Sequence, residues 1–224
     1  MFHLMVDSET LGVKSNTAPM IQLAIVPFDP NANHGPATGA YIKRMIGEID
    51  PNHAALDHDD EYWDPVNCYI DLKTVCRPPF NRTIDPDTLM WWLTEGGADL
   101  LTEILQKGKG ETGVSMHEAL NQAEYYIAKF RNAGILSGVW ANSPSFDLAM
   151  LKDLFSQVET ECTWSFRQEL DFRTETRRQQ FDWGGGFVTK VEEDGRGHDA
   201  FVDCHRQIRN VQEAIRSSGR PWGA

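Results

Sequence analysis

The sequence predicts an α/β fold in which helices cover a mixed β-sheet, and three features of the chain support this. Apolar stretches of strand length come first, a helix–strand–helix alternation occupies the middle, and further helical patterns follow. The 224 residues suffice for a well-packed core. No internal repeat or low-complexity linker divides the chain, so we expect a single domain over residues 1–216 and a loose C-terminal tail at 217–224.

The N-terminal part predicts strands. Residues 3–7 and 20–28 are apolar runs of strand length, and we expect a third strand at residues 39–46 after a turn rich in Asp, Asn and Pro. Residues 47–82 read as an irregular acidic insertion. Seven acidic residues and no Lys or Arg lie between Glu48 and Asp64, and a Pro-Pro pair follows at Pro78.

The central and C-terminal parts predict helices with recognisable starts. Asp85 before a proline is a typical cap, and Ser115 with Glu118 forms a capping box for a helix that stops at Gly134. A short buried strand is expected at residues 137–142, and Ser143-Pro144 then opens another helix. The last helix is expected at about residues 199–217.

Composition narrows the classes of function. A net charge of -12 argues against a protein that coats nucleic acid, although arginines are frequent after Ser165. No apolar stretch is long enough to span a membrane, and the N-terminus lacks the pattern of a signal peptide. The four cysteines show no CxxC spacing. We therefore expect a cytoplasmic protein with reduced thiols and no membrane partner.

A pair of carboxylates ends the first strand. Asp7 and Glu9 are two residues apart, so on a strand they share one face. Two carboxylates this close favour a divalent cation such as Mg²⁺ or Mn²⁺, which prefers oxygen ligands. Taken alone, the pair could equally lie in a solvated turn.

Three further residues are placed to join this pair. Asp147 lies in the first turn of the helix that follows residues 137–142, and Asp203 lies early in the last helix. Helix starts and strand ends gather at one edge of such a sheet, where ligands usually bind. His198 is five residues before Asp203, so it does not share a helical face with it and belongs to the preceding loop. Asp199 is the expected helix cap.

Three motifs in order resemble the DnaQ-like DEDDh 3′–5′ exonucleases, which have an RNase H-like fold. They are DSETLG at residue 7, SPSFDLAML at residue 143 and HDAFVD at residue 198. The segments WWL, WANSPSFD and CTWSFRQELDFRT resemble the branch of exoribonuclease-type phage and mycobacterial enzymes and DexA-type phage exonucleases. The resemblance covers roughly residues 3–215 and implies a central mixed five-stranded sheet with helices on both faces. It also implies a bacterial or phage-infected cell as the place where the protein acts.

The resemblance implies a two-metal hydrolysis. Asp7, Glu9, Asp147 and Asp203 would hold two divalent ions, Mg²⁺ or Mn²⁺, around the scissile phosphate. His198 would act as general base toward a metal-activated water, and a 5′-mononucleotide would leave the 3′ end of single-stranded DNA or RNA. All five residues are therefore candidate catalytic residues.

Several flanking residues are candidates for binding the substrate. By resemblance, Thr10 would contact the terminal 3′-hydroxyl and Leu11 would wedge between the last two bases. Of two adjacent tryptophans, one is expected in the core and the other stacked on a base. The full candidate set is Ser8, Thr10, Leu11, Trp91, Trp92, Asn142 and Phe146.

Other readings of the sequence remain open. The chain could be a non-catalytic nucleic-acid or protein-binding module on the same fold, or an RNase H-like endonuclease or integrase. An Arg–Asp structural pair is favoured over a phosphate clamp for Arg167, Asp171 and Arg173, and Gly184–Gly186 is expected to form a flexible loop beside His198. The sequence does not decide between DNA and RNA, nor does it show an interface for the homodimer that is common among relatives.

Overall fold

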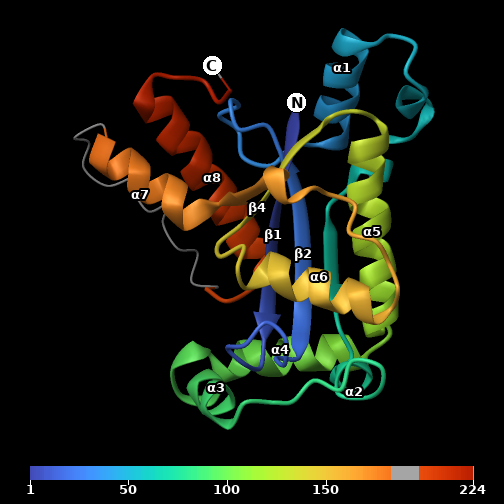
Figure 1. Cartoon of the computed structure of the whole chain (residues 1–224), viewed down its shortest axis with the longest axis vertical. Coiled ribbons are helices and arrows are strands. Elements are labelled where there is room, and N and C mark those ends of the chain that lie inside the picture. Colours follow the sequence, from blue (N-terminus) through green and yellow to red (C-terminus); the bar gives the residue numbers. More distant parts are fainter. Residues whose placement is uncertain (183–196, 224) are drawn as a thin grey trace.

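The computed structural model describes residues 1–182 and 197–223 and contains a five-stranded mixed sheet (Figure 1). The strand order is β3-β2-β1-β4-β5. Strand β1 runs antiparallel to β2 and parallel to β4, so the strand that carries Asp7 and Glu9 lies beside the strand that leads to Asp147. The strands are β1 Phe2–Thr10, β2 Met20–Phe28, β3 Val66–Tyr69, β4 Leu136–Ala141 and β5 Glu169–Asp171.

Helices cover both faces of the sheet, as the sequence predicts. Leu4 and Val6 of β1 point into the larger core, which α5 and α6 close, whereas Met5 points to the opposite face beneath α8 (Figure 1). A third apolar cluster lies at the end of the sheet under α4 and contains Leu11 and Trp92. The long helices are α1 Gly39–Ile49, α4 Ala98–Lys109, α5 Met116–Asn132, α6 Asp147–Gln157, α7 Phe172–Asp182 and α8 Ala200–Ser218.

The predicted third strand at residues 39–46 is wrong, because this segment forms helix α1. Its buried residues Ile42 and Ile46 are four apart, which is helical spacing, and Thr38 caps the helix by accepting a hydrogen bond from the amide of Tyr41. The third strand along the chain is instead Val66–Tyr69, at the edge of the sheet.

The segment 47–82 is more regular than expected. It contains two 3₁₀ turns, η1 Ala54–Asp57 and η2 Asp60–Trp63, then strand β3 and the short helix α2 Leu72–Val75. Trp63 is fully buried in the main core and anchors the acidic stretch to the domain.

The helix starts agree with the sequence reading. Asp85 caps α3 Pro86–Trp91, Ser115 and Glu118 form the capping box of α5, and Asp199 accepts hydrogen bonds from two amides at the start of α8. Helix α4 was not predicted, and a π-helical turn, η3 Trp92–Gly96, precedes it. Among the described helices, none combines the length and apolarity needed to cross a membrane.

The C-terminal tail is not loose at its tryptophan. Trp222 packs on His3 and Trp140, and its amide donates a hydrogen bond to Asn31. This contact joins the end of the chain to the start of β1, and both termini lie at the same end of the sheet (Figure 1).

Candidate active site

The acidic pair of β1 lies on the face of the sheet that α8 covers. Asp7 and Glu9 alternate with Ser8, which points to the opposite face, and both carboxylates are only 7% exposed. The register of β1 against β2 shifts between Glu9 and Thr10, where the strand leaves the sheet. Two buried carboxylates therefore lie at the C-terminal end of β1, in the middle of the sheet.

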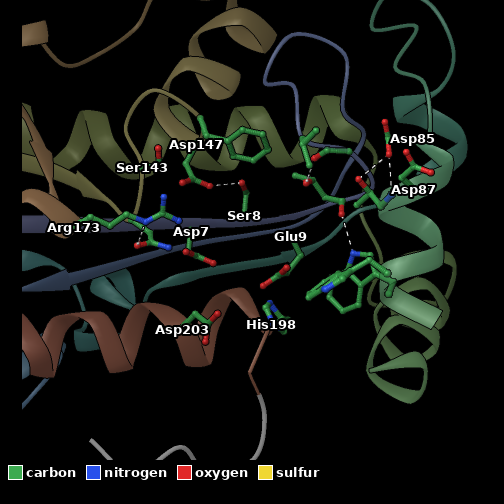
Figure 2. Close-up of a pocket in the computed structure, with 18 of the residues that line it drawn as sticks. Asp7, Ser8, Glu9, Asp85, Asp87, Ser143, Asp147, Arg173, His198 and Asp203 are labelled. Carbon is green, nitrogen blue, oxygen red and sulfur yellow. Dashed lines mark hydrogen bonds between the residues drawn. The ribbon is translucent and has the colours of Figure 1, made fainter. Parts of the chain in front are cut away.

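Two helix starts bring the other acids to this end of β1 (Figure 2). Asp147 is the first residue of α6 and accepts a hydrogen bond of 2.7 Å from the Ser8 hydroxyl. Asp203 lies in the first turn of α8, on the opposite side of Asp7 and Glu9 in this view. A helix N-terminus stabilises a carboxylate, which offsets part of the cost of burial.

Two residues that the sequence analysis missed contact these acids. The buried amide of Gln207 donates a hydrogen bond of 2.8 Å to Oδ1 of Asp7, and Arg206 forms an ion pair of 2.8 Å with Asp203. Both follow from helical spacing, since residues three and four after Asp203 lie near it on α8. That spacing was the only signal available in the sequence.

His198 lies in the loop before α8, as predicted. It is exposed, with a left-handed backbone φ of 71°, and its ring meets the edge of Trp91 with 4.8 Å between ring centroids. A nitrogen of His198 and one carboxylate oxygen each from Glu9 and Asp203 lie within 4.8 Å of one another. The left-handed backbone thus holds an imidazole beside the acids.

Crowding and burial shift the acids toward their protonated forms. Burial first, then the charges of the neighbouring acids, raises the pKa of Asp7 and of Glu9 well above the usual range, although the Gln207 hydrogen bond works the other way on Asp7. Burial raises the pKa of Asp147 to about 6, against the Ser8 hydrogen bond. Burial also raises the pKa of Asp203, against the charge of Arg206.

The donor set fits divalent cations. Four carboxylates lie in this buried site with one Arg at contact distance, so negative charge is in excess. Burial raises the pKa values of the acids, and too little positive charge lies beside them to oppose this. Hard ions such as Mg²⁺ and Mn²⁺ bind carboxylate oxygens. The residues present therefore suit a divalent-metal site.

A cavity of about 930 Å³ opens above the acids. Trp91 is 36% exposed and forms part of its wall, whereas Trp92 is 2% exposed and donates its indole hydrogen to the carbonyl of Thr10. The two tryptophans thus divide between surface and core. The candidate residues that line the cavity are Ser8, Thr10, Trp91, Trp92, Asn142 and Phe146.

Leu11 does not line this cavity. It is 1% exposed and packs with Ile21 and Trp92 in the third apolar cluster, so the expectation of a wedge at Leu11 needs correcting. Its neighbour Val13 is 72% exposed and lies on the cavity wall instead. The chain turns at Gly12, whose carbonyl accepts a hydrogen bond from the Thr10 hydroxyl. Leu11, before this turn, points into the core, and Val13, after it, points to the cavity.

The arginine expected to pair with an aspartate faces the cavity. Arg173 donates a hydrogen bond of 3.2 Å to Asn142, and both residues line the cavity. Asp171 accepts a hydrogen bond from the amide of Thr174 instead, and Arg167 lies over the ring of Phe166. The expected Gly184–Gly186 loop lies outside the described residues.

Comparison with known proteins identifies the family of this chain. Residues 2–215 match the family described as 3′–5′ exoribonuclease Rv2179c-like domain. No curated protein matches the chain. Among solved structures, the zinc-bound Escherichia coli ExoI–ssDNA complex is similar over 99% of this chain and 42% of that chain, with 13% sequence identity and a TM-score of 0.54. The chain therefore spans less than half the length of that protein.

A second solved structure has about the same length as this chain. The nuclease domain of 3′hExo, a DEDDh family member bound to rAMP, is similar over 97% of this chain and 92% of that chain, with 10% identity and a TM-score of 0.48.

Proposed function

Because the chain belongs to the 3′–5′ exoribonuclease Rv2179c-like domain family, we propose that it releases 5′-mononucleotides from the 3′ end of single-stranded RNA. The observation that carries this proposal is the convergence of four buried carboxylates and an exposed histidine at the floor of an open cavity (Figure 2). This set matches the needs of phosphodiester hydrolysis, which requires charge neutralisation and one group that accepts a proton.

The acids would hold two divalent ions, Mg²⁺ or Mn²⁺. Asp7 lies centrally among the four acids, with Asp147 on one side of it and Asp203 on the other, and all four carboxylates would hold the ions (Figure 2). When bound, such ions acidify a water and stabilise the charge that develops on the phosphate. Gln207 and Ser8 each occupy one carboxylate oxygen and so orient Asp7 and Asp147.

His198 accepts the proton of the attacking water at a ring nitrogen. Its position beside Glu9 and Asp203 supports this role, and so does its exposure to the cavity. Its nearness to two carboxylates would also allow it to bind a metal, so the two roles need an experiment that separates them.

The cavity walls suggest how the chain end is bound. Trp91 offers an exposed indole on which a base can stack, and Val13 adds an exposed apolar side chain to the cavity wall. Arg173 and Arg206 line the cavity and can meet phosphate oxygens. Ser8 acts on Asp147 in this arrangement, so we assign it to the metal site and no longer to the substrate.

Single-stranded ends are the proposed substrates for two reasons. The structurally similar E. coli protein is in complex with single-stranded DNA. The acids here lie at the bottom of a cavity that a chain end can enter. A non-catalytic module on the same fold is disfavoured, because all five reactive groups are in place.

Digestion of 5′-labelled oligonucleotides tests this proposal. Matched RNA and DNA, single- and double-stranded, are incubated with Mn²⁺ or Mg²⁺, and a circular single strand serves as the control without ends. We expect a ladder that shortens from the 3′ end, faster on RNA, with 5′-mononucleotide as product. Cleavage of the circle would instead indicate an endonuclease, and a faster ladder on DNA would overturn the RNA assignment.

A further inference from the structure

A second cavity lies beside the C-terminal half of α8, away from the acids. Its volume is about 360 Å³, and its walls come from α8 and from the loop that follows β2. In Figure 1 this loop and the end of α8 lie together near the chain termini, whereas the start of α8 lies at the active-site edge. The lining residues are Asn33, His34, Gly35, Arg209, Gln212, Glu213 and Arg216.

The loop is fixed to the helix by a buried glutamine. Gln212 is 5% exposed, its Oε1 accepts a hydrogen bond of 2.9 Å from the amide of Gly35, and its Nε2 donates to the carbonyls of Asp29 and Gly35. Gly35 has a φ of +82°, which favours glycine at this turn. The cavity wall is therefore held in place by hydrogen bonds.

The charges in this cavity are mainly those of guanidinium groups. Arg209 is exposed and has no carboxylate partner within residues 1–182 and 197–223, whereas Arg216 pairs with Glu213. Within the described residues, the Arg209 guanidinium is thus open to an anionic ligand, although the net charge of the chain is -12. Arg binds phosphate through two parallel hydrogen bonds, so phosphate is the ligand chemistry that this cavity fits best.

Arginines connect the two cavities along one side of α8. Arg206 lines the active-site cavity, and Arg209 follows it at a rise of about 4.5 Å. Arg216 lies about 15 Å beyond Arg206 along the axis, and the three side chains fall within about 80° around the helix. A strand that enters the active site past Arg206 can therefore continue along this row.

We propose that the Arg209–Arg216 cavity binds the phosphodiester backbone of the substrate upstream of the nucleotide that is removed. The inference rests on the proposed function and deepens it, since it adds a second contact for long substrates. A dinucleotide is too short to reach from the acids to Arg216, whereas a longer strand can bind both regions. The protein should therefore bind long strands more tightly than short ones.

Kinetics on substrates of different length test this inference. For the double variant Arg209→Ala/Arg216→Ala we expect KM on a single-stranded octanucleotide or longer strand to rise about tenfold, with kcat and dinucleotide hydrolysis unchanged. The slope of the logarithm of the binding constant against the logarithm of salt concentration should become less steep, by an amount that corresponds to about one or two phosphate contacts. Arg131→Ala, on the helix that covers the opposite face, is the control that removes one positive charge away from this cavity, and it should leave KM unchanged.

A second variant should act in the opposite direction. Glu213→Gln removes the carboxylate that pairs with Arg216, so KM for long strands should fall. Equal losses on dinucleotide and long strand, or no loss in the double variant, would overturn the inference. So would a double variant that is altered only in inhibition by inorganic phosphate, because this would indicate a site for the free anion.

The proposed function and this inference can fail separately. If wild-type protein hydrolyses no substrate of any length, the function is wrong. Fluorescence anisotropy with a labelled, non-cleavable octanucleotide still tests the cavity in that case: weaker binding by the double variant and unchanged binding by Arg131→Ala would support it.

Discussion

At the scale of single residues, the site depends on how four carboxylates are kept close together. Burial raises the pKa values of Asp7, Glu9, Asp147 and Asp203, and repulsion from neighbouring acids adds to this for Asp7 and Glu9. Ser8 and Gln207 oppose this by donating hydrogen bonds to Asp147 and Asp7. The site therefore lowers the free energy of unfolding of the ion-free protein, and bound divalent ions should raise it again.

Metal-free protein should lose stability as the pH rises. The pKa of Asp147 is about 6 in the fold, above its usual value of 3.8, so between these values the folded state binds more protons than the unfolded state. The free energy of unfolding then falls with rising pH by a total on the order of 3 kcal/mol, and it stays low above pH 6. Thermal unfolding with chelator at pH 5 and 7.5 measures the part of this loss that falls above pH 5, roughly half of it.

Asp147→Asn is the matched control for that measurement. The variant should show a smaller fall than wild type, and Mn²⁺ at pH 7.5 should restore stability to the wild type. A wild-type melting temperature that changes with pH no more than that of the variant would contradict the assignment.

Gln207→Met should weaken ion binding without unfolding the protein. Methionine has about the volume of glutamine but cannot donate to Asp7, which then loses its fixed orientation. Residues that orient a metal ligand typically contribute 10–100-fold to affinity. Titration calorimetry with Mn²⁺ should show a loss in this range, and unchanged affinity would mean that Gln207 has only a packing role.

His198→Ala separates the two roles open to this histidine. A general base typically contributes 10²–10⁴-fold to the rate, so we expect a loss of this size in kcat. The Mn²⁺ affinity should stay near that of wild type. If the affinity falls together with kcat, His198 is a ligand of the ion and the base must be sought elsewhere.

At the scale of elements, the start of the π-helical turn η3 separates two adjacent tryptophans. Trp92 holds the end of β1 through its hydrogen bond to Thr10 and its packing against Leu11, whereas Trp91 faces the cavity and His198. The turn thus connects the part of the cavity wall formed by Trp91 to the end of β1. The sequence predicted one core and one exposed tryptophan but not their order, because adjacent positions on a helix differ only by rotation.

The two tryptophans should respond differently to truncation. Trp92→Ala should lower the free energy of unfolding by about 3–5 kcal/mol, as is typical for a buried aromatic residue. Trp91→Ala should change stability little but raise KM through the loss of stacking, which is worth about 1–3 kcal/mol per base. Chemical denaturation and steady-state kinetics on both variants give the comparison, and the reverse pattern would refute the placement.

Helix starts could be predicted from the sequence, whereas the type of some elements could not. The helix starts at Asp85, Ser115 and Asp199 were predicted because capping depends on a few neighbouring residues. Helix α1 was mistaken for a strand, since its apolar residues fit both periods over a short stretch, and β3 was hidden in a polar segment at the edge of the sheet.

At the scale of the whole molecule, the family motifs predicted the sheet and the site more fully than local patterns did. Asp7, Glu9, Asp147, His198 and Asp203 come from three distant segments, and the fold brings them to one edge of the sheet. Leu11 and the C-terminal tail at Trp222 differ from expectation because their positions depend on packing between segments far apart in sequence. The Arg209–Arg216 cavity likewise exists only once α8 meets the loop after β2.

The central claim is that the four carboxylates act as one ion-dependent hydrolytic site. Its most direct test compares wild type and Asp7→Asn on a 5′-labelled single-stranded RNA with Mn²⁺, after circular dichroism has shown both to be folded. The account predicts a 3′-to-5′ ladder from wild type, no ladder with chelator, and at least a thousandfold slower hydrolysis by Asp7→Asn, because its ion site has lost the central carboxylate. A ladder of equal rate from Asp7→Asn, or none from wild type, would contradict it.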